Sequence, residues 1–408
     1  MVLAGGAAAS EVPPRAVRLA ALEGAARVVV GRVERVDRLD RHGYLARIEV
    51  ERELGTGPGG ESASRPDEVA LVAFEELATG RPPRLRAGTR VLVGLGGRPR
   101  GSLWRERLAA RPREPGVHEL AGEGRALLED PDDATAGLLA AWLAAQRRDP
   151  GGPAALELLA ELVRRADPRL ALEAAAALEA APGLAARLPE PGWTRLREAL
   201  LDPERPEVLR RALLELAGER RLSALRPVVA ELAKPERGSG LELPALAALA
   251  ALDGGLCADR LAALLADDRP EARRLAVRAP GPPLGPATLA RLARSDPDPG
   301  VRREALAELL RRRGVDALAD GLRGLGDPDP GVRAAAAHGV AALGEPAVEP
   351  LVAEVHRTTG EAREAALAAL AACGAAGHRA LGRLAASHPD PAVRGLARLA
   401  LGKLDAGH

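Results

Sequence analysis

The chain has 408 residues, enough for two ordinary domains or one extended array of repeats. Hydrophobic residues make up 47% and charged residues 28%, which excludes a disordered chain and predicts a folded one. The net charge is +1, and residues 1–130 carry 21 basic and 19 acidic side chains, so neither part has the basic surplus typical of a nucleic-acid-binding protein. No apolar run reaches the roughly 18 residues of a membrane-spanning helix. We expect neither a nucleic-acid partner nor a membrane span.

The segment 1–20 predicts a disordered terminus or the remnant of a signal peptide. Its Ala-Ala-Ala-Ser at residues 7–10 is similar to a signal-peptidase site, but it has no charged start and no long apolar core. If a signal peptide precedes Met1, we expect a periplasmic or secreted protein whose mature chain begins near Ser10. Otherwise we expect the protein in the cytoplasm.

Residues 21–128 predict a domain of strands. Apolar and charged residues alternate in ARVVVGRVERVDRL (26–39) and YLARIEVEREL (44–54), the period of two expected of half-buried strands. DEVALVAF (67–74) and TRVLVGL (89–95) are two further candidates, and GVHELAG (116–122) is a weaker one. We expect them to close into a small antiparallel β-barrel.

This strand pattern resembles the OB-type barrel of netrin-like and tissue-inhibitor-of-metalloproteinases-like domains in bacterial extracytoplasmic proteins. The matching stretches are VRLAALEGAARVVVGRVERV, YLARIEVERELGTG and LRAGTRVLVGL. The eukaryotic relatives depend on cysteines near their mature N-terminus, and this segment has none. The resemblance therefore implies an OB-like fold but not inhibition of metalloproteases.

Residues 130–404 predict an all-α solenoid of about eight helix pairs, in which helices alternate with proline and glycine. The clearest repeat places an arginine after an apolar residue at spacings of 31, 30 and 31, at Arg302, Arg333, Arg363 and Arg394. Glycines follow at a spacing of 30, at Gly314, Gly344 and Gly374. A period of this length with two helices per unit is typical of a solenoid, in which each pair buries its apolar stripe against its neighbours.

The repeated stretch DPDPGVRREALAELL (296–310) has a physical explanation. Asp298 can accept a backbone N–H bond as helix cap, and Pro299 suits the first helical position. Val301, Ala305, Leu306 and Leu309 then form one apolar stripe, and Gly314 supplies the left-handed residue that ends the helix.

This repeat resembles the HEAT repeat, particularly the bacterial HEAT-like repeats of phycobilisome lyase proteins. The matching residues are Asp298, Val301, Arg302 and Ala305, then Asp329, Val332, Arg333 and Ala336, and finally Asp390, Val393 and Arg394. In the Arg363 copy, Gly360 stands where the aspartate is expected. The resemblance implies that each arginine bonds the loop aspartate of a neighbouring unit, with Asp298, Asp329 and Asp390 as partners. We call Asp298, Arg302, Asp329, Arg333, Arg363, Asp390 and Arg394 the ladder. A structural role is favoured over the alternative, a row of guanidinium groups that binds carboxylates or phosphates.

Other chemistry is not predicted: we expect no catalytic residues, no metal site and no cofactor. His338, His356, His378 and His388 lie in successive helices, where stacking can bring two of them together, but none has the His-Glu pairing of the HEAT-repeat di-iron hydroxylases. Cys257 and Cys373 have no second Cys or His at metal spacing.

The sequence therefore predicts a non-enzymatic scaffold that binds an unidentified protein along its solenoid. One alternative is a chromophore lyase or isomerase of the phycobilisome type, although the five aromatic residues of the chain are few for a planar ligand. The other is a HEAT-like nucleic-acid-binding or DNA-repair protein, which the balanced charge opposes.

Overall fold

The computed structural model describes residues 18–54, 69–75, 85–100, 102–108, 116–234, 240–279 and 284–405. By its contacts the chain divides into two compact units, Met1–Ala248 and Leu249–His408. Most of the terminal segment predicted over 1–20 lies outside the described residues, and its last residues enter the short helix α1 (Leu19–Glu23).

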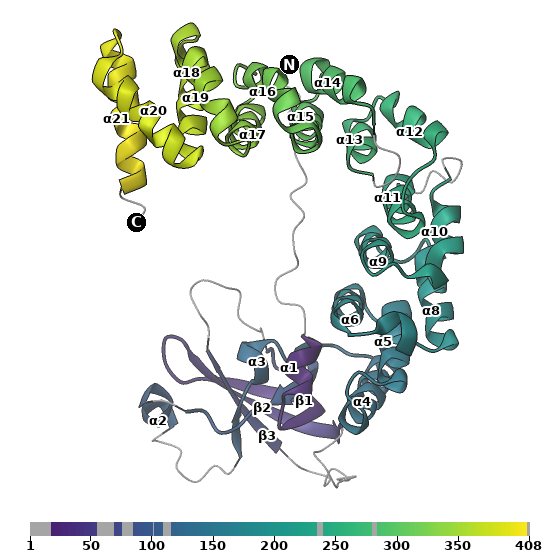
Figure 1. Cartoon of the computed structure of the whole chain (residues 1–408). Coiled ribbons are helices and arrows are strands. Elements are labelled where there is room, and N and C mark those ends of the chain that lie inside the picture. Colours follow the sequence, from purple (N-terminus) through teal and green to yellow (C-terminus); the bar gives the residue numbers. More distant parts are fainter. Residues whose placement is uncertain are drawn as a thin grey trace, which may run out of the picture. The chain divides into compact units, whose positions relative to one another are not determined.

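The first unit begins with a sheet of six strands in the order β5-β3-β2-β1-β4-β6 (Figure 1). All neighbouring strands are antiparallel except β3 and β5, which are parallel. The first five strands coincide with the predicted segments, and the sixth was not predicted. Their bounds are β1 Arg27–Arg38, β2 Gly43–Glu53, β3 Val69–Glu75, β4 Arg90–Leu95, β5 Val117–Glu119 and β6 Leu127–Glu129.

The apolar side chains at alternate positions of the strands are buried in two clusters. A cluster that includes Val29, Ile48, Val72 and Val93 joins β1 to β4. A second cluster includes Leu45, Leu71 and Val117, and Leu108 and Trp104 of α2 (Ser102–Leu108) pack against these strands. A Cβ added at Gly94 of β4 would lie 2.7 Å from the Cβ of Ala126 and 3.0 Å from the Cβ of Ala25, so only glycine fits there. The alternation seen in the sequence is therefore the alternation of buried faces.

The sheet is not a closed barrel, which corrects the prediction of a small antiparallel barrel. β5 has only three residues, and all three pair with β3 in parallel. On the β4 side the structure has an isolated bridge between Leu95 and Leu120 and two backbone bonds, in which Glu119 exchanges with Gly96 and Gly97 at 2.8 and 3.0 Å. A strand this short cannot form a full ladder on both sides.

Gly31 of β1 is expected to be essential for the irregular pairing of β1 with β2. The register shifts between Val30 and Gly31, and a Cβ at Gly31 would lie 2.3 Å from the carbonyl oxygen of Glu49. We expect Gly31→Ala to destabilise the first unit by about 1–3 kcal/mol through this overlap, measured as a lower melting temperature by circular dichroism.

The matched control is Gly137→Ala in α4 (Asp133–Arg148), where no atom lies within 4 Å of the added Cβ. Because alanine favours a helix more than glycine does, this variant should be more stable than the wild type by up to about 1 kcal/mol. A Gly31→Ala variant that melts at the wild-type temperature would contradict the expected overlap.

The rest of the first unit is helical and is bonded to the sheet. Arg90 of β4 donates from Nε to Glu51 of β2 at 2.8 Å and from Nη2 to Asp133 at the start of α4 at 2.7 Å. Gln146 of α4 donates to Glu23 of α1 at 3.1 Å. The remaining helices of this unit are α3 Ala121–Gly124, α5 Pro153–Arg165, α6 Pro168–Ala180, α7 Leu184–Arg187, α8 Glu190–Leu201, α9 Glu207–Glu219 and α10 Arg226–Leu232.

The second unit is a stack of helix pairs in two layers (Figure 1). In one layer α13, α15, α17, α19 and α21 each pack on the next; in the other, α14 packs on α16 and α18 on α20. The division between the units falls within α11. The helices are α11 Glu242–Asp253, α12 Ala258–Leu265, α13 Pro270–Arg278, α14 Pro286–Ser295, α15 Pro299–Arg313, α16 Leu318–Gly324, α17 Pro330–Ala341, α18 Val348–Arg357, α19 Gly360–Ala372, α20 Gly374–Ser387 and α21 Pro391–Asp405.

The predicted start and end of the repeated helix are confirmed. Asp298 Oδ1 accepts the Val301 N–H at 2.9 Å, Pro299 is the first residue of α15, and Gly314 follows its last residue with a φ of 54°. The apolar stripe is buried throughout, and one core runs from Val277 to Ala397. Each pair thus buries its stripe against its neighbours, as the repeat pattern requires.

Candidate functional site

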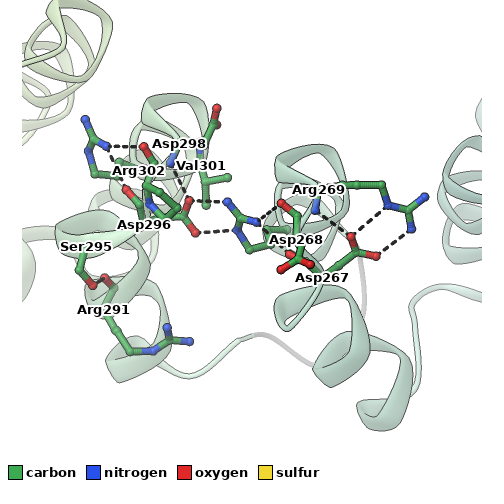
Figure 2. A network of polar contacts seen from close by, with 11 residues as sticks. Asp267, Asp268, Arg269, Arg291, Ser295, Asp296, Asp298, Val301 and Arg302 are labelled. Carbon is green, nitrogen blue, oxygen red and sulfur yellow. Dashed lines mark hydrogen bonds and ion pairs between the residues drawn. The ribbon is translucent and has the colours of Figure 1, made fainter.

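In the second unit, the ladder arginines join successive helical repeats of the stack. Arg302 of α15 donates from Nε and Nη2 to the two carboxylate oxygens of Asp327 in the next loop, at 2.9 and 2.8 Å. Its Nη1 donates to the carbonyl of Asp296 in the loop before it, at 2.9 Å (Figure 2). The side chains of Arg302 and Asp327 are 12% and 11% exposed. One guanidinium therefore bridges two loops through a nearly buried, two-pronged ion pair.

An earlier rung, not predicted as part of the ladder, repeats this geometry. Arg273 of α13 donates to both oxygens of Asp296 at 2.8 and 2.9 Å, and its Nη1 bonds the carbonyls of Asp267 and Asp268. The pair is even less exposed, at 10% and 3%. A signal was present in the sequence, because Arg273 precedes Arg302 by 29 residues, close to the repeat period.

The aspartates that pair with these arginines differ from the predicted ones. Asp298 and Asp329 cap their helices, accepting the N–H groups of Val301 and Val332 at 2.9 and 3.0 Å. The first aspartate of each Asp-Pro-Asp loop, Asp296 or Asp327, binds the arginine instead. The reason is geometric, since a carboxylate folded over a helix start is turned away from the previous unit.

The later rungs vary. Arg333 pairs with Glu361 at 2.8 Å. In this repeat the residue at the helix cap, where Asp298 and Asp329 stand in the others, is Thr359; Gly360, which was expected there, is the first residue of α19. Arg363 donates to Asp390 Oδ2 at 3.1 Å and to the carbonyl of Thr358. Arg394 donates from Nη1 to the carbonyls of His388 and Pro389, and no carboxylate faces it among the residues described up to Asp405.

The contact between Arg302 and Asp327 shifts the pKa values of both groups toward their charged forms. Burial disfavours the charged Asp327 carboxylate, but the bonds from Arg302 and from the Asp329 N–H outweigh it and hold the pKa of Asp327 below its usual range. Asp327 in turn raises the pKa of Arg302. Because the folded-state pKa is lowered, the pair's contribution to stability is complete above about pH 4 and is lost as the pH falls through that lowered value.

Stacking does bring two of the predicted histidines together. His388 Nε2 lies 3.0 Å from His356 Nδ1, and the rings stack with centroids 4.6 Å apart. His388 is only 6% exposed and directly follows the last residue of α20, so it lies at the end of a helix and not within one as predicted. His378 Nε2 lies 3.0 Å from the carbonyl of Ala371, and His338 is exposed on α17.

Among the described residues, no group of three His, Cys, Asp or Glu side chains is placed to hold a metal ion. Cys257 is exposed and Cys373 is buried, and burial raises the pKa of the Cys373 thiol. In the part of the chain that the structure describes, no helix combines the length and apolarity needed to cross a membrane.

Comparison with known proteins identifies the repeat. The profile of the HEAT repeats family matches residues 286–371, which contain α14 to α19. The curated proteins contain no match. An engineered protein of known structure is similar at 20% identity over 62% of this chain and 97% of its own, with a TM-score of 0.16. Computationally designed armadillo repeat proteins for modular peptide recognition are similar at 21% identity over 60% of this chain and 98% of their own, with a TM-score of 0.17.

The profile match and the two-layer stack of helix pairs together identify the repeat. Residues 286–371 are HEAT-like repeats, and they form part of the helical array of the second unit.

Proposed function

We propose that the protein is a non-enzymatic scaffold whose HEAT-like array binds another protein. The observation that carries the proposal is how the arginines of the stack are bonded: Arg273, Arg302 and Arg363 direct their guanidinium groups at carboxylates and carbonyls of adjacent loops. Groups bonded in this way stabilise the stack and are not free to bind phosphates. HEAT and armadillo repeats commonly serve as interaction scaffolds, because a stack of repeats exposes a long continuous surface.

The surface we propose for binding is the exposed side of α15, α17, α19 and α21, which we call the odd-helix face. It combines small, charged and apolar side chains, as many protein interfaces do. Leu399 of α21 is 63% exposed, the most exposed of the large hydrophobic residues described. The exposed residues that define the face are Arg303, Ala307, Ala334, His338, Glu364, Ala368 and Leu399.

Two arginines placed on this face are expected to abolish partner binding without unfolding the array. Ala334 of α17 and Ala368 of α19 are both exposed, so Ala334→Arg with Ala368→Arg adds bulk and charge only at the surface. We expect the melting temperature to stay within about 2 °C, since surface substitutions change stability by about 0.5 kcal/mol or less. Capture of the partner found by affinity purification should fall at least about tenfold, since the added side chains clash with a docked surface.

The matched control places the same change on the other layer, as Ala319→Arg in α16 with Ala353→Arg in α18, both also exposed. This variant should capture the partner as the wild type does. Loss of capture only in the control would move the binding surface to the other layer. A reaction catalysed on the purified partner, or capture of nucleic acid alone, would contradict the scaffold.

For the sheet, the proposal retains an OB-like fold with an incomplete closure. The strand order, the parallel β3–β5 pairing and the bridge between Leu95 and Leu120 support it. The resemblance to extracytoplasmic domains also makes a location outside the cytoplasm part of the proposal. Fractionation of the native cells, with a cytoplasmic enzyme as marker, tests that location.

A further inference from the structure

Arg394 of α21 has the loop bonds of a complete rung but no carboxylate. Its Nη1 donates to the carbonyls of His388 and Pro389 at 2.6 and 3.0 Å. Arg302 holds the carbonyl six residues before it in the same way, at 2.9 Å, while its Nε and Nη2 bind Asp327. Among the side chains that the structure describes, no carboxylate takes that place beside Arg394. Its guanidinium group is therefore held at one nitrogen and can receive a carboxylate at the other two.

One turn further along α21, an exposed arginine stands where other helices of the layer have a buried leucine. The residue four positions after the ladder arginine is Leu306 in α15 and Leu367 in α19, which are 1% and 3% exposed. Leu306 packs against Gly324 of α16, in the next helix pair. In α21 the same position is Arg398, which is exposed and donates to the carbonyl of Ala385 at 3.3 Å. An arginine here is unsuited to burial against a further apolar helix pair.

Arg394, Arg398 and Leu401 follow one another at spacings of four and three, so they lie on one side of α21, which we call the end face. Two like charges one helical turn apart repel each other. Asp390, one turn before Arg394, is bound to Arg363 and does not neutralise the pair. The end face is therefore a basic surface with a partly buried leucine beside it.

The charge of the helix pair has the same sign. Residues 374–401, from the start of α20 to the last partly buried leucine of α21, contain four arginines and one aspartate. The preceding pair, residues 348–372, contains two arginines and four glutamates. A ligand that is complementary to the end face is therefore acidic.

We propose that the end face binds an acidic segment of a partner protein, whose carboxylates pair with Arg394 and Arg398 beside Leu401. The inference rests on the proposed scaffold function and adds a second contact region to the odd-helix face. A carboxylate is the favoured ligand, because Arg273 and Arg302 each bind a carboxylate through Nε and Nη2.

Other occupants fit these side chains less well. A second copy of the chain would bring two basic end faces together, and its Asp296 and Asp327 are already bound to arginines of their own array. Single-stranded nucleic acid is bound by a basic groove with aromatic side chains that stack on the bases, and this chain has five aromatic residues in all.

Fluorescence anisotropy with labelled poly-L-glutamate as the probe tests the end face on the full chain. The wild type should bind the probe, and more weakly as the salt concentration rises. Arg398→Glu reverses the charge of an exposed side chain, so it should weaken binding about tenfold or more. Arg394→Gln removes the second cation and should weaken binding to a similar extent. The melting temperature of Arg398→Glu should stay within about 2 °C of the wild type, which excludes unfolding as the cause.

The matched control is Arg291→Glu, the same change at an exposed arginine of α14. It should bind the probe within about twofold of the wild type, because a charge away from the end face is screened by salt. Absence of saturable binding by the wild type, unchanged affinity in either end-face variant, or an equal loss in Arg291→Glu overturns the proposal. Single-stranded DNA that binds as tightly as poly-L-glutamate would assign the end face to phosphates and also overturns it.

Failure of this inference can be distinguished from failure of the scaffold. Ala334→Arg with Ala368→Arg, on the odd-helix face, should lose the partner and keep the probe. If Arg398→Glu binds the probe as the wild type does while the odd-helix variant still loses the partner, the end face is wrong and the scaffold stands.

Discussion

Replacing Val332 by aspartate should unfold the second unit while the first stays folded. Val332 is fully buried in α17, within the core that runs from Val277 to Ala397. A carboxylate there would be buried among apolar side chains, so we expect a loss of about 4 kcal/mol or more, comparable with the whole stability of a small domain. The melting curve should lose the transition of the second unit.

Limited proteolysis distinguishes this outcome from general unfolding. The variant should leave a protected fragment containing the sheet and the helices of the first unit, because each repeat is supported only by its neighbours. Ala334→Asp, two residues further along the same helix and exposed, is the control and should be digested as the wild type is. Loss of both units together in Val332→Asp would contradict their independence.

Much of the fold could be predicted because local rules decide it. Alternating apolar residues located β1 to β4, and the spacing of Asp298, Pro299 and Gly314 located both ends of α15. These features depend on neighbours within a few positions. The closure of the sheet depends instead on whether the three residues of β5 pair with β3 or with β4. Both strands are distant in sequence, so no local pattern predicts the pairing.

The ladder could be predicted only in part for a related reason. The period identifies the arginines, but Asp-Pro-Asp offers two carboxylates that are equal as sequence. Only the helix start decides that the second one caps and the first one meets the arginine. The bond between Arg333 and Glu361, in a loop without Asp-Pro-Asp, required the packing of the units to be known.

The contact between His356 and His388 could not be predicted from the sequence, for a different reason. The sequence positions of His338, His356, His378 and His388 gave no indication of which two would meet. The answer depends on the side of α18 that faces the loop before α21, a property of the stack rather than of either segment.

The two aspartates of one loop should respond very differently to the same isosteric change. Asp327→Asn removes the charge that Arg302 binds through two bonds, at a site where both side chains are nearly buried. It keeps an oxygen for the Asp329 N–H, so the change isolates the ion pair. We expect a loss of about 2–3 kcal/mol, because an arginine is left without its buried counter-charge. Urea denaturation at pH 7 measures it.

Asp329→Asn is the control, because asparagine caps a helix about as well as aspartate. It should change the free energy of unfolding by less than about 0.5 kcal/mol, since Val332 keeps its acceptor. Adding Arg302→Leu to Asp327→Asn should recover part of the loss, because the stranded cation is gone. Equal effects of the two Asn variants would mean that the rung between Arg302 and Asp327 does not hold the units together. The ladder arginines would then be candidates for binding a partner.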